Sequence, residues 1–218
     1  MRTEHATVRS QRFPTLRVRG AVRNLAIVLG DQLDPHAAAL TGLDASTDAV
    51  LMMEVAGEST HVPSHKQRTT LFLAAMRHFA IELQRRGFRV QYVPLDDPAN
   101  THSLRGEIRR AAKTLKPAAL RCTRPGEWRV QRAVDAAAAA TGLPLHTLPD
   151  RHFLVSDMEF AGWMAERKQP VMEHFYRWQR RRLGILVEPN GAPAGGQWNY
   201  DRQNCGSFRR VPQVPQPY

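Results

Sequence analysis

Short apolar runs alternate with longer segments of helical pattern through most of this chain of 218 residues. The first run, residues 25–29, is apolar at every position, which is typical of a parallel strand covered on both faces. Parallel neighbours must be joined by long crossovers, which are usually helices and almost always right-handed. The sequence therefore predicts an α/β fold, a mostly parallel, five-stranded, doubly wound and Rossmann-like sheet followed by two or more helices. The predicted strands cover residues 25–29, 48–56, 88–95, 118–123 and 143–148.

The first two predicted strands both end in polar residues. Gly30, Asp31 and Gln32 follow the first strand, and Glu58 follows the second. The carboxyl ends of neighbouring parallel strands lie at one edge of the sheet, where open α/β sheets bind their ligands. A glycine at that edge lets the backbone approach a ligand closely. These residues are therefore candidates for a binding rim, and a simple strand-to-loop turn is the alternative interpretation.

A long helix is predicted after the second strand. Ser64 and Gln67 form a capping box at its start. Apolar residues at helical spacing form the face that should pack on the sheet; they are Phe72, Met76, Phe79 and Leu83. The first turn carries three basic residues, His65, Lys66 and Arg68. Their charges oppose the helix dipole, so an anionic ligand or Glu58 would offset them, and solvation by water is the alternative.

Composition divides the chain into four parts. Residues 1–23 hold six arginines and one acidic residue, which predicts a disordered basic extension, although a transit peptide or a misplaced start codon fits equally well. Residues 24–150 form the α/β domain, and residues 151–186 form a helical extension. Its second helix carries Arg177, Arg180, Arg181 and Arg182, which suit phosphates or simply form a solvated face. Residues 187–218, rich in Gly, Pro and Asn, predict a linker and a tail.

The charge balance and the cysteine count limit the partners and the compartment. A total of 31 Lys and Arg against 20 Asp and Glu gives a net charge of +11, which favours polyanionic partners. No apolar run is long enough for a membrane-spanning helix. Two cysteines, Cys122 and Cys205, provide neither a disulfide framework nor the four ligands of an iron–sulfur cluster. We expect a cytoplasmic monomer.

Several catalytic motifs are missing from the sequence. It has no G-x-G-x-x-G after the first strand, no G-x-x-x-x-G-K-[ST] and no G-x-S-x-G, which disfavours nicotinamide enzymes, P-loop NTPases and serine hydrolases. His61 and His65 lie four residues apart, but the predicted helix start falls between them, so we expect no metal site. Asp31, Glu54 and Glu58 could pair as acid and base. Without a proposed substrate, we assign no catalytic residue.

Six motifs follow one another between residues 25 and 204. They are LAIVLGDQL from residue 25, EVAGES from residue 54, MRHFA from residue 76, PGEWRV from residue 125, MEHFYR from residue 172 and GGQWNYD from residue 195. In this order they resemble the deoxyribodipyrimidine photolyase-related proteins. These are the bacterial iron–sulfur branch of the photolyase/cryptochrome superfamily, which includes prokaryotic (6-4) photolyases. Six colinear motifs are much more specific than any one of them.

The resemblance implies a function for the predicted rim. Members of the family have an N-terminal α/β domain that binds a light-harvesting 6,7-dimethyl-8-ribityllumazine. A longer helical domain holds FAD and a four-cysteine [4Fe–4S] cluster and repairs damaged DNA by light-driven electron transfer. The resemblance implies that Gly30, Asp31, Gln32 and Glu58 surround the lumazine. His65 matches a family histidine and is a further candidate.

The sequence departs from the family pattern after Asn204, where it reads CGSFRRVPQVPQPY and ends. We therefore expect an antenna domain only, produced by a frameshift or a premature end and unable to repair DNA alone. Whether the chain is itself an enzyme stays open. Two alternatives also remain: a stand-alone nucleotide- or small-molecule-binding α/β module, and a remnant without function.

Overall fold

The computed structural model describes residues 16–201 and residue 213. The chain divides into two compact units, Met1–Ser156 and Asp157–Tyr218. The first unit thus continues slightly beyond residue 150, where the composition of the sequence changes. Within the described residues, no helix combines the length and the apolar character needed to cross a bilayer.

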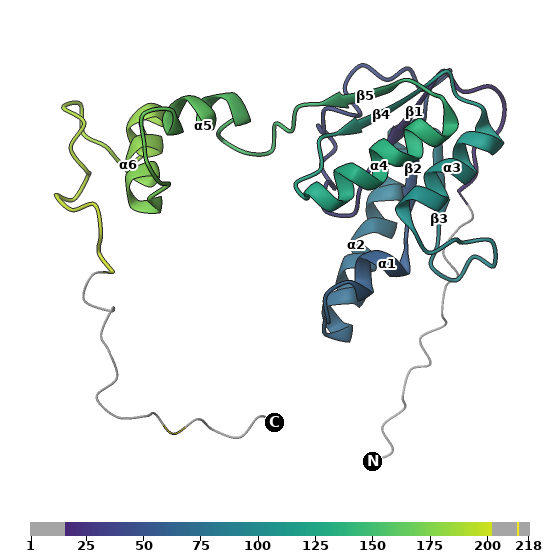
Figure 1. Ribbon diagram of the computed structural model, residues 1–218, viewed down its shortest axis with the longest axis horizontal. Coiled ribbons are helices and arrows are strands. Elements are labelled where there is room, and N and C mark those ends of the chain that lie inside the picture. Colours follow the sequence, from purple (N-terminus) through teal and green to yellow (C-terminus); the bar gives the residue numbers. More distant parts are fainter. Residues whose placement is uncertain (1–15, 202–212, 214–218) are drawn as a thin grey trace, which may run out of the picture. The chain divides into compact units, whose positions relative to one another are not determined.

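A five-stranded, entirely parallel sheet forms the centre of the first unit (Figure 1). The strands lie in the order β3-β2-β1-β4-β5. The chain thus adds β2 and β3 on one side of β1, and then adds β4 and β5 on the other side of β1. The predicted α/β class and parallel sheet are confirmed. The order reverses between β1 and β4, and open α/β sheets bind ligands at the carboxyl ends of the strands near such a reversal. The strands are β1 (Asn24–Ile27), β2 (Ala49–Met53), β3 (Val90–Val93), β4 (Ala119–Thr123) and β5 (Leu145–Leu148).

Helices cover both faces of this sheet, which makes it doubly wound. Leu25 and Ile27 of β1 belong to the apolar layer that contains α3 and α4, whereas Ala26 and Val28 belong to the layer that contains α2. Successive strand residues point to opposite faces, so a strand covered on both sides must be apolar at consecutive positions. The helices of this unit are α1 (Ala56–Thr60), α2 (Lys66–Arg85), α3 (Leu104–Leu115) and α4 (Trp128–Thr141).

The segment between β2 and α2 differs from the sequence prediction. The predicted strand continues to residue 56, whereas β2 ends at Met53 and the residues from Ala56 form the five-residue helix α1, which carries Glu58. Helix α2 begins at Lys66, and its N-cap is His65, whose Nδ1 accepts a hydrogen bond from the Gln67 backbone amide at 3.2 Å. Ser64 is therefore not the cap. The imidazole of His65 satisfies one of the free amides at the helix start, as a Ser hydroxyl would have done.

The last residues of the predicted basic extension pack against the sheet. Leu16 is buried, and its carbonyl accepts a hydrogen bond from the Tyr92 amide of β3 at 3.0 Å. Arg23 makes a two-bond ion pair with Asp48, at 2.9 Å and 2.7 Å. Residues 16–23 are thus part of the first unit, contrary to the expected disorder through residue 23, because Leu16 and Val22 have apolar partners in the core. Residues 1–15 lie outside the described residues.

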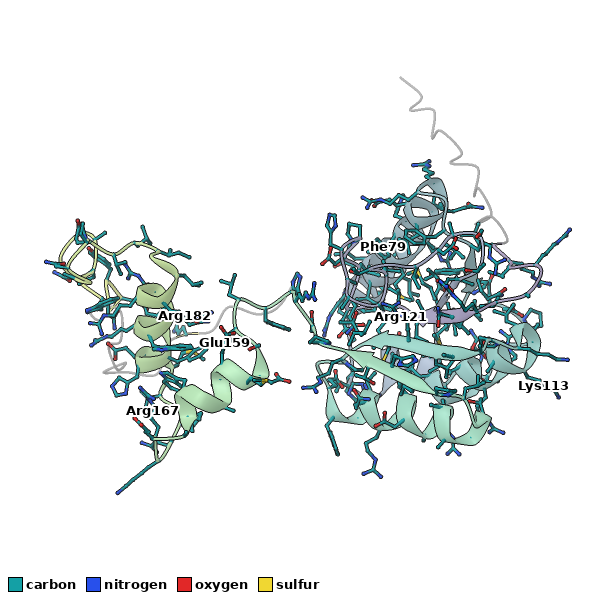
Figure 2. All side chains as sticks on the ribbon, turned by 90° about the horizontal axis from the view of Figure 1, so that it is seen from above. Phe79, Lys113, Arg121, Glu159, Arg167 and Arg182 are labelled. Atoms are coloured by element: carbon teal, nitrogen blue, oxygen red, sulfur yellow. The ribbon has the colours of Figure 1, made fainter. Side chains whose placement is uncertain are left out.

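The second unit contains α5 (Asp157–Met164) and α6 (Met172–Leu183). Its centre is a cluster of stacked, tilted and edge-to-face rings with centroids 5.0–6.2 Å apart, formed by Phe160, Trp163, Phe175 and Trp178. Glu159 of α5 and Arg182 of α6 lie side by side in Figure 2 and form an ion pair at 2.6 Å. Cys205 and most of the predicted divergent tail lie outside the described residues.

Candidate ligand-binding site

A cavity of about 430 Å³ opens at the carboxyl ends of β1 and β2. Its volume falls in the range of about 300–1,000 Å³ that is usual for small-molecule sites. Apolar side chains form much of the wall; they include Leu29, Val55, Phe72, Leu73, Met76 and Val130. Polar side chains also line it; they include Asp31, Glu58, Ser59, His61, Arg68 and Glu127. An apolar wall with a few polar groups suits a flat ring system that carries hydrogen-bonding substituents.

Gly30 permits a close contact between the end of β1 and helix α2. A Cβ atom at this position would lie 2.5 Å from Cε1 of Phe72 and 2.9 Å from Sδ of Met76. Both distances are well below van der Waals contact, so any larger residue would displace these side chains. Because both side chains line the cavity, Gly30 determines its shape through packing.

Asp31 lies on the cavity wall with its side chain exposed. Partial loss of hydration raises the pKa of its carboxyl group, and the hydrogen bond that the carboxylate accepts from its own backbone amide acts in the opposite direction. The negative charges of Glu127, Glu58 and Asp150 raise the pKa further. A ligand that donates hydrogen bonds or carries positive charge would relieve this accumulation of negative charge.

Glu58 is held in place by an arginine from another helix. Arg129 of α4 donates two hydrogen bonds to the Glu58 carboxylate, each 2.8 Å long, and a third to Glu127 at 3.0 Å. These bonds raise the pKa of Arg129. They also connect α1 to the start of α4 across the cavity mouth. Glu58 thus presents a fixed carboxylate with lone pairs left for a ligand.

Glu54 lines the cavity, but its carboxylate is fully engaged by the protein. It accepts hydrogen bonds from Arg77 at 2.5 Å and 2.8 Å, from the Tyr92 hydroxyl at 2.6 Å and from the Leu95 amide at 2.8 Å. Burial alone would raise its pKa, but these donors outweigh burial and lower it. Glu54 is therefore a structural anion and does not act as an acid or base with Asp31 and Glu58.

Two of the predicted site residues, Gln32 of the rim and the further candidate His65, do not line this cavity. Gln32 donates from Nε2 to the carbonyls of Arg124 at 3.0 Å and Thr123 at 3.4 Å, which ties the loop after β1 to the end of β4. His65 is exposed and caps α2, as described above. The structure therefore brings Gly30, Asp31 and Glu58 together and leaves Gln32 and His65 outside the cavity.

The sequence did not identify Phe72 or Arg129 as parts of the site. Phe72 follows the periodicity of the buried face of α2, yet its side chain is 42% exposed. The reason is length, because the 20 residues of α2 span about 30 Å, whereas the four residues of β1 span about 13 Å. The first turns of α2 therefore extend past the sheet and line the cavity. Arg129 reaches Glu58 across 71 positions of sequence, and no local pattern encodes that pairing.

The described residues contain no cluster of three or more His, Cys, Asp or Glu side chains that could hold a metal ion. Cys122 is buried in the core, its Sγ lies 3.7 Å from the Thr147 hydroxyl, and burial raises the pKa of its thiol. Such a cysteine packs as a small apolar residue.

A parallel α/β unit with a mixed apolar and polar cavity at its carboxyl edge is an arrangement in which small-molecule sites are common. Residues 26–218 match the family model described as "Deoxyribodipyrimidine photo-lyase-related protein". The chain therefore belongs to this family, as the six motifs indicate. It is 45% identical over 181 residues to a protein named "(6-4) photolyase" from Agrobacterium fabrum (strain C58 / ATCC 33970). That match covers 83% of this chain and 35% of the relative, so the chain spans about a third of the relative's length.

Proposed function

We propose that the first unit binds a light-harvesting 6,7-dimethyl-8-ribityllumazine in the cavity at the ends of β1 and β2. One observation carries the proposal: a single cavity of about 430 Å³ is lined by apolar side chains and also by the carboxylates of Asp31, Glu58 and Glu127. A lumazine has a flat bicyclic ring and a chain of hydroxyl groups, and it needs both kinds of surface. Family membership supports the same conclusion.

The lining residues fit the two parts of such a molecule. The side chains of Phe72 and Met76, which lie against Gly30, would contact the ring system. Asp31 and Glu58 would accept hydrogen bonds from ribityl hydroxyls, which are neutral donors. The cofactor would supply the light absorption, and the protein would bind and orient it.

The wider function follows from the family as part of the same proposal. Excitation of the lumazine would pass to a flavin bound elsewhere in full-length relatives, which would use it to repair damaged DNA. The four-cysteine cluster of the iron–sulfur branch does not fit the residues described here, because Cys122 is the one free cysteine among them and it is buried. We therefore assign this chain the antenna role and no step that involves the cluster.

A nucleotide- or other small-molecule-binding module is the second candidate, and Arg68 is the observation that favours it. Its side chain lines the cavity close to the start of α2 and could pair with a phosphate. FMN and riboflavin separate the two candidates, because they share a ring and a ribityl chain and differ by one phosphate. The antenna proposal expects FMN to gain no affinity over riboflavin, whereas a phosphate site at Arg68 expects FMN to bind at least tenfold more tightly.

Titration of the purified chain with 6,7-dimethyl-8-ribityllumazine, followed by its fluorescence anisotropy, tests the main proposal. The double variant Asp31→Asn, Glu58→Gln should bind at least tenfold more weakly, since hydrogen bonds to charged groups contribute about 1.5–3 kcal/mol each. Glu82→Gln is the matched control, because Glu82 lies on α2 and is ion-paired with Arg86 away from the cavity. Absence of saturable binding by a folded chain at micromolar concentrations would overturn the proposal.

A further inference from the structure

Three guanidinium groups of the second unit surround one indole ring. The Cζ atoms of Arg180 and Arg181 each lie 4.9 Å from the centroid of the Trp198 ring, and that of Arg177 lies 5.8 Å away. The charged centres of Arg180 and Arg181 are therefore no farther apart than twice 4.9 Å. Cation–π attraction to the ring offsets part of their repulsion, and an anion would offset the rest.

The acidic residues of this unit neutralise only some of these arginines. Glu173 pairs with Arg177, and Glu159 pairs with Arg182. Arg180 donates to uncharged oxygens, which are the carbonyls of Ile185 and Leu186 and the hydroxyl of Tyr176. Arg181 donates to the Gly191 carbonyl at 3.3 Å. In the described part of the chain, neither Arg180 nor Arg181 is paired with a carboxylate, so both keep an unbalanced positive charge.

A cavity of about 300 Å³ lies against this cluster. Its lining is almost entirely cationic and aromatic; it consists of Arg167, His174, Arg177, Trp178 and Arg181. Within the described residues, Nε of Arg177 is buried without a hydrogen-bond partner. A buried donor without an acceptor is unfavourable, so the Arg177 side chain would gain from turning Nε towards an anion bound in the cavity.

The location near the end of α6 explains part of the pattern, because cations at a helix C-terminus interact favourably with its dipole. That effect does not require a cavity lined by these arginines. Guanidinium groups bind phosphate oxygens through paired N–H donors. We propose that the cavity formed by Arg167, Arg177 and Arg181 binds a phosphate group, either free or within a nucleic-acid strand. The residues of this site belong to the second unit, and those of the proposed lumazine cavity belong to the first.

Arginine Nε–Hε resonances of the ¹⁵N-labelled full chain, followed while inorganic phosphate is added, test this proposal. Saturable shifts of the Arg177 and Arg181 signals are expected. The variant Arg177→Gln, Arg181→Gln should bind phosphate at least tenfold more weakly. The control variant Arg85→Gln, Arg105→Gln removes the same charge from exposed positions of α2 and α3 and should stay within twofold of the wild type.

A second measurement identifies the source of the phosphate. A fluorescent ten-nucleotide oligo(dT) that binds at least tenfold more tightly than inorganic phosphate, and that loses this affinity in the Arg177 and Arg181 variant only, points to a nucleic-acid strand. Equal affinities point to free phosphate. Two results would show general charge attraction and overturn the site. One is an equal loss of oligo(dT) affinity in the Arg177 and Arg181 variant and in the control variant. The other is binding of polyglutamate as tight as that of oligo(dT). If the double Gln variant does not fold, Arg181→Lys replaces it. It keeps the charge but lacks the planar fork, and an unchanged phosphate affinity in that variant would also overturn the proposal.

Discussion

Glu54 should be required for the stability of the first unit and not for ligand binding. Its carboxylate is completely buried and accepts four hydrogen bonds from three residues, including both bonds from Arg77. Glu54→Gln keeps the shape but removes the charge, and it turns an NH₂ group towards at least one of these donors. Breaking a buried ion pair costs about 3–5 kcal/mol when the remaining charge stays buried. Arg77 is 36% exposed and can turn to water, so we expect a loss of about 2–3 kcal/mol.

Urea unfolding at pH 7 measures this loss. With a slope of about 1–3 kcal/mol per molar urea, the midpoint should fall by about 0.7–3 M. Amide exchange at Leu95 assigns the change to the first unit, because this amide donates to Glu54 at 2.8 Å and should become less protected. Lumazine affinity of the folded variant should change by less than threefold.

The difference in stability between the wild type and Glu54→Gln depends on pH. The pKa of Glu54 is lowered on folding from its ordinary value of 4.5, so its stabilising contribution is present above that value and is lost as the pH falls through the folded pKa. The difference between wild type and Glu54→Gln should therefore shrink in acid. A loss below about 0.5 kcal/mol at pH 7 would refute this account of Glu54, because surface substitutions without structural consequence fall in that range. An unchanged stability combined with a tenfold loss of lumazine binding would instead make Glu54 a ligand contact.

Three further predictions concern the cavity. Gly30→Val should weaken lumazine binding at least tenfold in fluorescence titrations while the circular dichroism spectrum stays native, because its side chain displaces Phe72 and Met76; wild-type affinity would contradict the packing role. Arg129→Ala should release Glu58 and weaken binding about threefold to fivefold, as expected for an exposed ion pair of up to about 1 kcal/mol, and an unchanged titration would show that Glu58 needs no positioning. Asp31→Asn should raise the urea midpoint at pH 7 but not at pH 3. The folded pKa of Asp31 is raised, so its favourable contribution exists below the ordinary value of 3.8 and is lost as the pH rises through the folded pKa; equal effects at both pH values would disprove the shift.

The fold was predictable because its signal is local and repeated. Residues 25–29 are apolar at every position since both faces of β1 are covered, and the lengths of the intervening segments require crossover helices. The first two strand ends were also predictable as a site, because parallel topology alone places them at one edge. The packing of Leu16 against β3 was not predictable, since the arginine-rich composition indicates disorder and the hydrogen bond of Leu16 to Tyr92 depends on a strand 76 positions later.

The side chains of the site were less predictable than its location, because each depends on a partner from another element. Gln32 follows Asp31 directly, yet it turns away to bind carbonyls at the end of β4. His65 is of a residue type that often contacts ligands, but its ring serves as the N-cap of α2. Phe72 has the spacing of a core residue, but α2 extends past the ends of the strands at this point and its side chain is partly exposed. In each example the sequence indicates where the residue lies on its own helix or strand. It does not indicate which residues of other elements that side chain contacts.

The three acidic residues near the carboxyl ends of β1 and β2 show the same distinction in chemical terms. Glu54 is saturated by donors of its own protein, Glu58 is fixed by Arg129 but retains acceptor capacity, and Asp31 is exposed among other negative charges. A general acid or base must be free to exchange a proton with the reacting group, and the partners of Glu54 leave it no such capacity. The two that remain can accept hydrogen bonds from one ligand on the same wall. Under the proposed function, these two carboxylates would accept hydrogen bonds from the hydroxyl groups of the chromophore.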